Sequence, residues 1–432
     1  MYKKSKFNFF CYNDQKELLL YNCYQGMKSL CKIKDTNNQS IFLNGNIAEN
    51  SSLQDSLYKR GYLVSNDADE NSKLDLLINS VISPNDLKLV FSVTENCNFR
   101  CKYCYESHQN ISISSDLRDD LILYVRNNIQ KVNELSISWF GGEPLMEKEL
   151  IMDMSEKLIR ICNFNKRRYS AFITTNGYLL DIKTFEDLLK CRINIFQITV
   201  DGVESTHNYN RPFVNGGYTF EKIINNLNEI KKSKNKNFHI IIRTNVTYEI
   251  YNNIEEYITL ISNLCEGDDR FSVMIHYASA WNPEIEEDFK LKIFNDRDNV
   301  LDFYNRLIGS KRKIKFTFMI DPQNASCFYA SKNRFFIRPN GEIHVCSVFS
   351  EKKENIIGYL SNGNISLKDN YFSKIIDPKS CKSLYSCFYA PVCKGDICPS
   401  ERENKQGCPT TKNHLDYILK LIDLRGDLQI IG

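Results

Sequence analysis

The stretch LKLVFSVTENCNFRCKYC, residues 87–104, places an apolar run directly before three closely spaced cysteines. Residues 87–93 have the short apolar pattern of a buried β-strand. Cys97, Cys101 and Cys104 follow at intervals of four and three residues, so one short loop carries three thiols. Three thiolates leave one position of a four-ligand metal site open, and an open position is where a further ligand binds. The stretch predicts a metal centre on the loop that follows a strand.

Strands and helices alternate after this first strand. Strands are predicted at 87–93, 135–140, 169–174, 194–200, 239–246, 271–277 and 314–320, and helices at 116–131, 146–162, 181–190, 219–232 and 252–264. This alternation indicates an α/β protein with a parallel sheet, open or closed into a barrel. In such sheets the chemistry lies in the loops at the carboxyl ends of the strands. We therefore expect the three cysteines at the functional edge of the sheet.

The two ends of the chain have a different character. Residues 1–85 contain short strand-like runs and a helix near 52–60, which predict a small α+β domain. From about residue 325 regular periodicity fades, and cysteine, glycine and proline become frequent until a last helix at 411–424. A loop-rich domain held by metal rather than by an apolar core fits that stretch. The predicted domains are 1–85, 86–322 and 323–432.

Composition limits the classes of function and the cellular compartment. Lys and Arg number 56 against 53 Asp and Glu, a net charge of +3 that implies no nucleic-acid partner. No signal peptide and no apolar stretch of about 18 residues is found, so we expect a cytoplasmic protein without a membrane partner. In that compartment the 16 cysteines are thiols rather than disulfides. With only six histidines, sulfur-only ligation favours iron–sulfur clusters or all-cysteine zinc sites.

The cysteine loop resembles one large enzyme family. Its C-x3-C-x2-C spacing, with the aromatic Tyr103 before the third cysteine, is similar to that of the radical S-adenosylmethionine enzymes. In that family three thiolates hold three irons of a [4Fe–4S] cluster, and S-adenosylmethionine chelates the fourth. The resemblance implies these two cofactors and a partial parallel (β/α)6 barrel. A zinc site, or chance spacing, is the alternative that the spacing alone leaves open.

Further motifs after the predicted strands resemble the same family. WFGGEPLM matches its GGEP element, in which glycines let the backbone approach a ligand. TTNG stands where the family contacts the ribose, and QITVDG and NYNRP supply Thr199 and Arg211 for the carboxylate of S-adenosylmethionine. A surface salt bridge is the alternative for Arg211. The cofactor-binding residues implied by the resemblance are Tyr103, Gly141, Gly142, Glu143, Pro144, Thr174, Asn176, Thr199 and Arg211.

The carboxyl-terminal cysteines carry a second resemblance. The C-x13-G-x4-C pattern that runs from Cys327 through Gly341 to Cys346 resembles the start of the SPASM extension, which carries auxiliary [4Fe–4S] clusters. Two of the later cysteine intervals are longer than is usual there. The resemblance implies two auxiliary clusters, the first with an open iron. Their ligands would be Cys327, Cys346 and Cys398 for the first, and Cys381, Cys387, Cys393 and Cys408 for the second. Structural zinc is the alternative.

The substrate is inferred from the segment before the barrel. In the 96 residues before Cys97, short strands followed by a helix resemble the peptide-recognition domain of maturases that act on ribosomally made peptides. Such domains bind a leader peptide as an added strand. The leading hypothesis is a peptide maturase that forms a Cys-derived thioether crosslink. Its partners would be a precursor peptide with a leader and a low-potential electron donor of the flavodoxin or ferredoxin type.

Three alternatives and one candidate residue complete the predictions. A sulfatase-type maturase that oxidises Cys or Ser to formylglycine is the alternative enzyme, and a non-catalytic, zinc-held peptide-binding protein is the alternative from another class. The amino-terminal segment is alternatively a structural extension that covers the barrel. Asp321, at the end of the last predicted strand, resembles a comparably placed aspartate of sulfatase maturases, which implies a role as catalytic base. A turn cap in DPQN explains this aspartate equally well.

Overall fold

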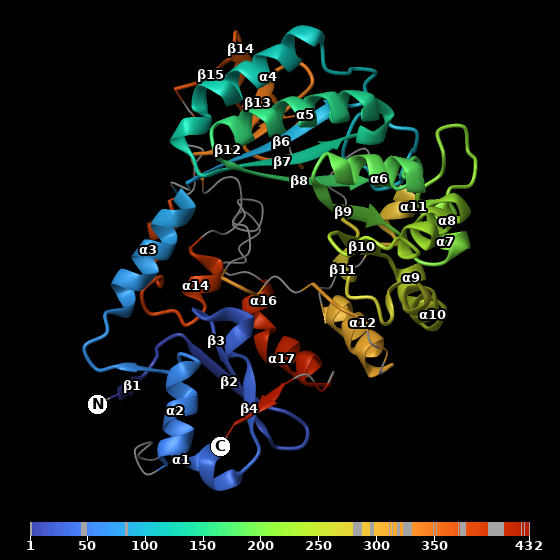
Figure 1. Cartoon of the computed structure of the whole chain (residues 1–432). Coiled ribbons are helices and arrows are strands. Elements are labelled where there is room, and N and C mark those ends of the chain that lie inside the picture. The colour runs from blue at the N-terminus through green and yellow to red at the C-terminus, as the bar shows by residue number, and fades with distance from the viewer. Residues whose placement is uncertain are drawn as a thin grey trace. The chain divides into compact units, whose positions relative to one another are not determined.

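The contacts of this computed structural model divide the chain into two compact units (Figure 1). The terminal unit comprises Met1–Pro84, Phe318–Lys332 and Ile375–Gly432, and the sheet unit comprises Asn85–Thr317 and Asn333–Lys374. No helix among the described residues is long and apolar enough to span a membrane. The structure describes residues 2–44, 50–82, 85–279, 287–293, 298–310, 312, 314–317, 320–322, 331–348, 350, 352–369, 371, 377–395, 410–424, 426 and 428–431.

Among the described residues, six parallel strands form one side of the large sheet and lie next to one another in chain order, with the last of them at the edge of the sheet. They are β6 (Asp86–Thr94), β7 (Glu134–Gly141), β8 (Arg168–Thr175), β9 (Ile193–Thr199), β10 (His239–Val246) and β11 (Phe271–Tyr277). The predicted parallel α/β sheet is therefore confirmed. Of the seventh predicted strand, Phe316 makes a single parallel bridge to Val273 of β11, and residues 318 and 319 lie outside the described ranges.

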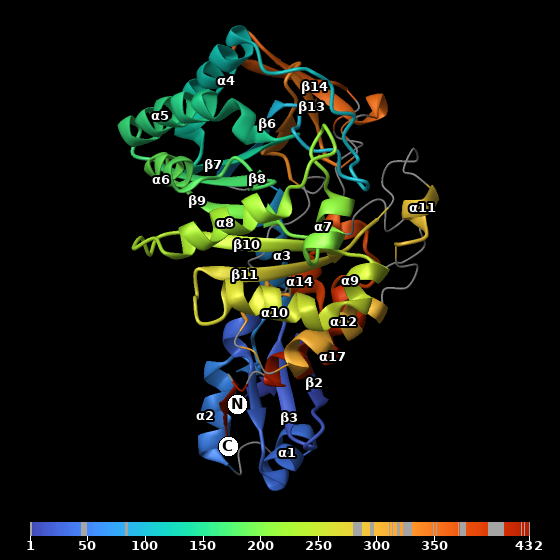
Figure 2. The ribbon, with the colours of Figure 1, turned by 90° about the vertical axis from the view of Figure 1, so that its right-hand side faces the viewer.

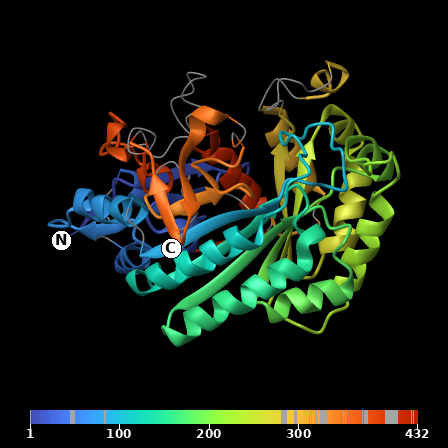
Figure 3. The ribbon, with the colours of Figure 1, turned by 90° about the horizontal axis from the view of Figure 1, so that it is seen from above.

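Helices connect the parallel strands and lie along the outer side of the curved sheet (Figure 3). Their sequences are amphipathic, and α6 also begins with a side-chain cap: Asp181 accepts the Thr184 N–H at 2.8 Å, and Phe185 and Leu188 of this helix are buried. The helices are α4 (Ser115–Asn128), α5 (Lys148–Phe164), α6 (Ile182–Lys190), α8 (Phe220–Lys231), α10 (Ile254–Cys265) and α12 (Asp298–Gly309).

The same sheet continues into a region that the sequence predicted to be rich in loops. Strand β12 (Arg334–Ile337) pairs with β6 in parallel, and β13 (Glu342–His344), β14 (Ile356–Ser361) and β15 (Asn364–Leu367) follow as antiparallel neighbours. The sheet has ten strands in the order β11-β10-β9-β8-β7-β6-β12-β13-β14-β15. Strand pairing thus holds these four segments, which corrects the loop-rich expectation for this part of the predicted carboxyl-terminal domain.

The terminal unit joins both ends of the chain in one core (Figure 2). Tyr21 and Leu74 pack in the same apolar cluster as Leu415 and Leu419. Helices α2 and α17 match the predicted ones, whereas α1 and α3 were not predicted. The elements are β1 (Tyr2–Lys4), β2 (Asn8–Tyr12), β3 (Leu18–Asn22), β4 (Cys31–Ile33), α1 (Thr36–Leu43), α2 (Ser51–Lys59), β5 (Leu63–Ser65), α3 (Glu70–Ile82), α14 (Ala390–Cys393), α16 (Thr410–Asn413), α17 (Leu415–Leu424) and β16 (Gln429–Ile430).

Candidate active site

A cavity of about 310 Å³ lies in the sheet unit, bordered by the loops that follow the parallel strands and by the ends of β8, β9 and β10. The three cysteines of the loop and most of the predicted cofactor-binding residues meet here, as expected for the carboxyl edge of a parallel sheet. Glu143 and Pro144 do not line the cavity. The predicted residues that line it are Cys97, Cys101, Tyr103, Cys104, Gly141, Gly142, Thr174, Asn176, Thr199 and Arg211.

The cysteine loop is fixed by backbone pairing with the segment that carries Arg211. The N–H of Arg100 donates to the Pro212 carbonyl at 2.9 Å, and the N–H of Lys102 donates to the Asn210 carbonyl at 2.9 Å. Phe99 and Phe213 form an antiparallel bridge next to the first of these bonds, and the N–H of Val214 donates to the Asn98 carbonyl at 2.8 Å on its other side. The loop of three thiols and the guanidinium of Arg211 are therefore held by the same short ladder.

Gly141 and Gly142 allow two backbone segments to approach each other closely. Gly141 has φ +124°, and a Cβ there would lie 2.2 Å from the Thr94 carbonyl oxygen. A Cβ on Gly142 would lie 2.4 Å from the Asn96 carbonyl oxygen. The N–H of Gly142 donates to Thr94 at 3.0 Å. Besides exposing backbone to the cavity, the glycines let the loop after β7 pack against the residues that precede Cys97.

Glu143 links the loop after β7 to the end of β8 through hydrogen bonds outside the cavity. Its fully buried carboxylate accepts from the Thr175 hydroxyl at 2.6 Å and from the N–H groups of Asn176 and Leu145 at 2.7 and 3.0 Å. Burial raises the pKa of this carboxyl, and the three donors oppose that shift. Pro144 is buried as well, at the start of the short helix η4 (Pro144–Glu147). These two residues support the cavity walls in this structure.

A buried polar network, which the sequence did not predict, surrounds the hydroxyl of Tyr103, the residue before the third cysteine. The Tyr103 hydroxyl donates to the Asp201 carboxylate and accepts from Arg211 Nη1 at 2.6 Å and from Asn245 Nδ2 at 3.1 Å. Asp201, which follows β9 in VDG, also accepts the Asn245 N–H at 2.8 Å. Asn245, Gln197 and Arg243 line the cavity beside the predicted residues. The position of Asp201 after a strand was the one signal in the sequence.

Burial disfavours the thiolate form of the three cysteines of the loop. Burial, together with the charges of Glu143 and Cys101, raises the pKa of Cys97 to about 12. Burial also raises the pKa of Cys101 and of Cys104. A bound metal reverses this tendency by stabilising thiolates.

The spacing of the thiols suits a cluster. Among the described residues no three His, Cys, Asp or Glu side chains converge as ligands of a single metal ion. The thiolates of an iron–sulfur cluster instead bind different irons, and three of them border one cavity here. The donor set therefore fits the [4Fe–4S] cluster that the sequence predicts.

The auxiliary-cluster ligands fall in both units. Cys346 follows β13 in the sheet unit, whereas Cys381, Cys387 and Cys393 pack against the apolar core of the terminal unit. Cys327, Cys398 and Cys408 lie outside the described residues. Auxiliary ligation by these seven cysteines stays a prediction.

Asp321 lies in the terminal unit. Its Oδ2 accepts the Met27 N–H at 3.2 Å in the short helix η1 (Gly26–Ser29). A Cβ on Gly26 would lie 2.6 Å from the same oxygen. This contact gives the side chain a structural role close to the turn-cap interpretation, although its partner is a distant segment of the chain. The catalytic role of Asp321 stays a prediction.

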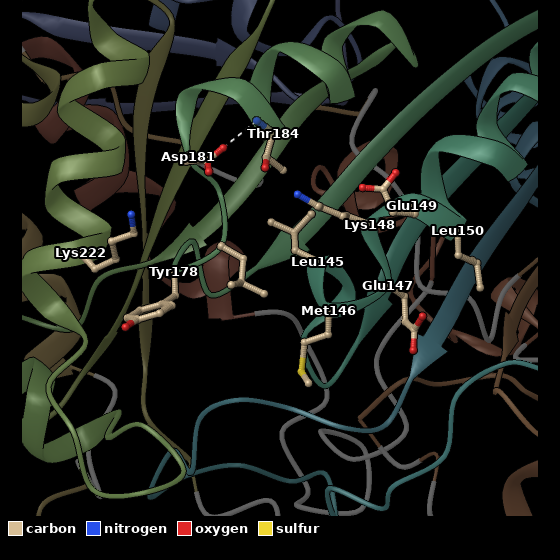
Figure 4. Close-up of a pocket in the computed structure, with 11 residues that line it drawn as sticks. Leu145, Met146, Glu147, Lys148, Glu149, Leu150, Tyr178, Asp181, Thr184 and Lys222 are labelled. Atoms are coloured by element: carbon tan, nitrogen blue, oxygen red, sulfur yellow. Dashed lines mark hydrogen bonds between the residues drawn. The ribbon is translucent and has the colours of Figure 1, made fainter.

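A second cavity, of about 540 Å³, borders the segments that follow β7 and β8 (Figure 4). It contains none of the predicted site residues and mixes acidic with basic side chains, so it presents no single charge to a ligand. Its lining is Leu145, Met146, Glu147, Lys148, Glu149, Leu150, Tyr178, Leu179, Asp181, Thr184 and Lys222.

The chain is similar to several known proteins. Residues 91–261 match the Radical SAM superfamily. The uncharacterized protein MJ0907 of Methanocaldococcus jannaschii is 26% identical over 299 residues, 68% of this chain and 93% of that protein. The cysteine-type anaerobic sulfatase-maturating enzyme of Clostridium perfringens is 22% identical over 383 residues, 79% of this chain and 98% of that enzyme. The structure of native anSMEcpe with bound AdoMet and the Kp18Cys peptide superposes with a TM-score of 0.59 at 17% identity, covering 79% of this chain and all of that one.

Proposed function

We propose that this chain, an enzyme whose residues 91–261 form a radical S-adenosylmethionine domain, is a peptide maturase that forms a Cys-derived thioether crosslink. One observation carries the proposal. The three thiols of the cysteine loop line one cavity with Gly141, Thr199 and Arg211, at the carboxyl edge of a parallel sheet. Thiolates can hold the irons of a cluster. Backbone without side chains and a buried guanidinium can bind the amino and carboxylate groups of S-adenosylmethionine.

Each of these residues has a defined task in the proposal. Cys97, Cys101 and Cys104 would hold three irons, and Thr199 with Arg211 would bind the carboxylate of S-adenosylmethionine. The backbone at Gly141 and Gly142 would accept hydrogen bonds from its ammonium group. Thr174 and Asn176 would contact the ribose. When bound, the two cofactors supply a 5′-deoxyadenosyl radical that abstracts hydrogen from a C–H bond. The protein orients the reactants and excludes water from the cavity.

A peptide substrate is supported by the terminal unit. Its four-stranded sheet ends at β2, which pairs only with β3 among the described residues. An unpaired strand edge offers N–H and C=O groups to an added strand. We propose that a leader peptide binds at such an edge, and that a low-potential flavodoxin or ferredoxin supplies the electron.

The thioether follows from the predicted auxiliary ligands. Cys327, Cys346 and Cys398 would leave one auxiliary iron open to a peptide thiolate. Joining that sulfur to a carbon radical gives a C–S bond and releases one electron, which the auxiliary cluster would accept. The thiol proton and the abstracted hydrogen atom leave the peptide, so its mass falls by two hydrogens. No oxygen enters the product.

Anaerobic reconstitution tests the function. Reduced enzyme is incubated with S-adenosylmethionine and with candidate precursor peptides, and the mixture is then treated with iodoacetamide. We expect 5′-deoxyadenosine, and a peptide lighter by two hydrogens with one alkylatable thiol fewer. Absence of 5′-deoxyadenosine from iron-loaded protein would refute the radical chemistry. A modified peptide that keeps every thiol would refute the thioether.

A second candidate is a sulfatase-type maturase. Its support is the similarity to the cysteine-type anaerobic sulfatase-maturating enzyme over 98% of that enzyme's length. This candidate predicts an aldehyde on the peptide in place of a crosslink, and hydrazide labelling of the product distinguishes the two.

A further inference from the structure

The Tyr103 hydroxyl is the centre of the buried polar network beside the cavity. A phenol has one hydrogen to donate and two lone pairs. The hydrogen goes to Asp201, and the lone pairs accept from Arg211 and Asn245. Asp201 is fully buried, and Arg211 and Asn245 are 6% and 7% exposed. The hydroxyl therefore uses its full hydrogen-bonding capacity on groups that water scarcely reaches.

Arg211 depends on this hydroxyl for its placement. Its Nη1 lies 3.9 Å from the Asp201 carboxylate but only 2.6 Å from the Tyr103 oxygen. The guanidinium also stands 5.7 Å from the centre of the Phe99 ring, and its Nε has no partner among the described residues. The Tyr103 hydroxyl thus bridges Asp201 and Arg211, and Arg211 lines the cavity.

We infer that Tyr103 and Asp201 are positioning residues, which hold the Arg211 guanidinium ready to bind a carboxylate group of the molecule that fills the cavity. The inference rests on the proposed function, in which this molecule is S-adenosylmethionine. A long arginine side chain loses rotamer freedom when it binds a ligand, and holding it in place beforehand removes most of that cost. The hydroxyl of Tyr103, and not its ring alone, then contributes to cofactor affinity.

Binding measurements with two ligands test this role. The ligands are S-adenosylmethionine and decarboxylated S-adenosylmethionine, which lacks only the carboxylate. Equilibrium dialysis on cluster-loaded protein gives the affinity for each ligand without any turnover. We expect Tyr103→Phe to weaken binding of the first ligand roughly tenfold, and of the second less than about twofold. Tyr169→Phe is the matched control, because its buried hydroxyl contacts Ser155 at 3.5 Å outside the cavity. It should change neither affinity.

A double-mutant cycle with Arg211→Ala tests the route of the effect. If Tyr103 acts through Arg211, adding Tyr103→Phe to Arg211→Ala should weaken binding no further. Iron content and thermal unfolding report whether each variant folds and keeps its cluster. Equal losses for both ligands, or additive losses in the cycle, would overturn the inference. Wild-type protein that binds neither ligand would instead remove the proposed function and, with it, this inference.

Discussion

Arg338 and Glu95 form a buried ion pair just ahead of the cysteine loop. The Nη2 of Arg338 lies 2.6 Å from Glu95 Oε1, and the two side chains are 11% and 10% exposed. Arg338 Nη1 also donates to the Ser350 carbonyl at 3.0 Å. Glu95 stands two residues before Cys97, so the strand pairs β12–β13 and β6–β7 are joined directly beside the predicted cluster.

Removing one partner of this pair should destabilise the sheet unit. Arg338→Met leaves the Glu95 carboxylate buried without its cation, and we expect a loss of about 3–5 kcal/mol of unfolding free energy. The exposed pair of Lys157 with Asp153 is the matched control, since its side chains are 48% and 47% exposed. Lys157→Met should cost less than about 1 kcal/mol. Thermal unfolding measures both variants, and equal shifts in midpoint would contradict the prediction.

Three glycine variants separate steric clash from backbone strain. Gly142→Ala introduces a Cβ 2.4 Å from the Asn96 carbonyl oxygen without a left-handed φ, whereas Gly267 has φ +76° and open space around it. Gly141 combines the left-handed φ with a clash. We expect Gly267→Ala to cost about 1 kcal/mol in stability and to leave the site intact.

The two variants at the site should also displace the cysteine loop. We expect Gly142→Ala and Gly141→Ala to reduce the iron retained after anaerobic reconstitution, and Gly141→Ala to have the larger effect. Iron content and S-adenosylmethionine binding are the measurements. A Gly142→Ala protein that keeps full iron and affinity would show that the loop after β7 shifts without cost.

The cysteine loop predicts a defined loss of iron. Replacing Cys97, Cys101 and Cys104 with Ala should remove one cluster, about four iron atoms, and abolish 5′-deoxyadenosine formation. The predicted auxiliary clusters should remain. Replacing Cys162, Cys191 and Cys265, which lie outside the cavity, is the control and should leave the iron content unchanged. Continued 5′-deoxyadenosine production by the first variant would contradict the assignment of the site.

The sequence was informative where one physical rule dominates. Strands β6 to β10 alternate buried residues with more exposed ones over much of their length, and their helices carry amphipathic patterns, so both could be predicted. The three thiols and the glycine pair were visible because few other structures use such spacing. Strands β12 to β15 were missed because they are short and lie among cysteines, which favoured a metal-held loop region.

The polar network could not be predicted for a different reason. Tyr103, Asp201 and Asn245 come from separate loops and strands that only the fold brings together. A tyrosine hydroxyl or a buried aspartate carries no sequence signature of its partner. The ladder between residues 98–102 and 210–214 is also a contact between distant segments, and no local pattern announces it.

The terminal unit should respond to acid through Glu17. This carboxylate lies 2.7 Å from Lys32 Nζ in β4, and the same Nζ lies 2.9 Å from the Asp423 carboxylate in α17. Lys32 therefore links Glu17, just before β3, to the carboxyl-terminal helix. Hydrogen bonding to Lys32 lowers the pKa of Glu17 to about 2, against an ordinary value of 4.5, and burial opposes the shift. Because the folded pKa is the lower one, this stabilisation is complete above pH 4.5 and is lost as the pH falls toward 2.

Glu17→Gln should therefore destabilise the protein at neutral pH but not in acid. We expect the free energy of unfolding of the wild type to exceed that of the variant by about 1–2 kcal/mol at pH 6. This difference should close progressively below pH 4.5. Thermal unfolding of both proteins at each pH gives the gap, and acid damage common to both cancels in the difference. Asp153→Asn, in an exposed pair, is the control and should show a small gap at every pH. A Glu17 gap that stays constant from pH 6 to pH 3 would mean that the carboxylate contributes through packing and not through its charge.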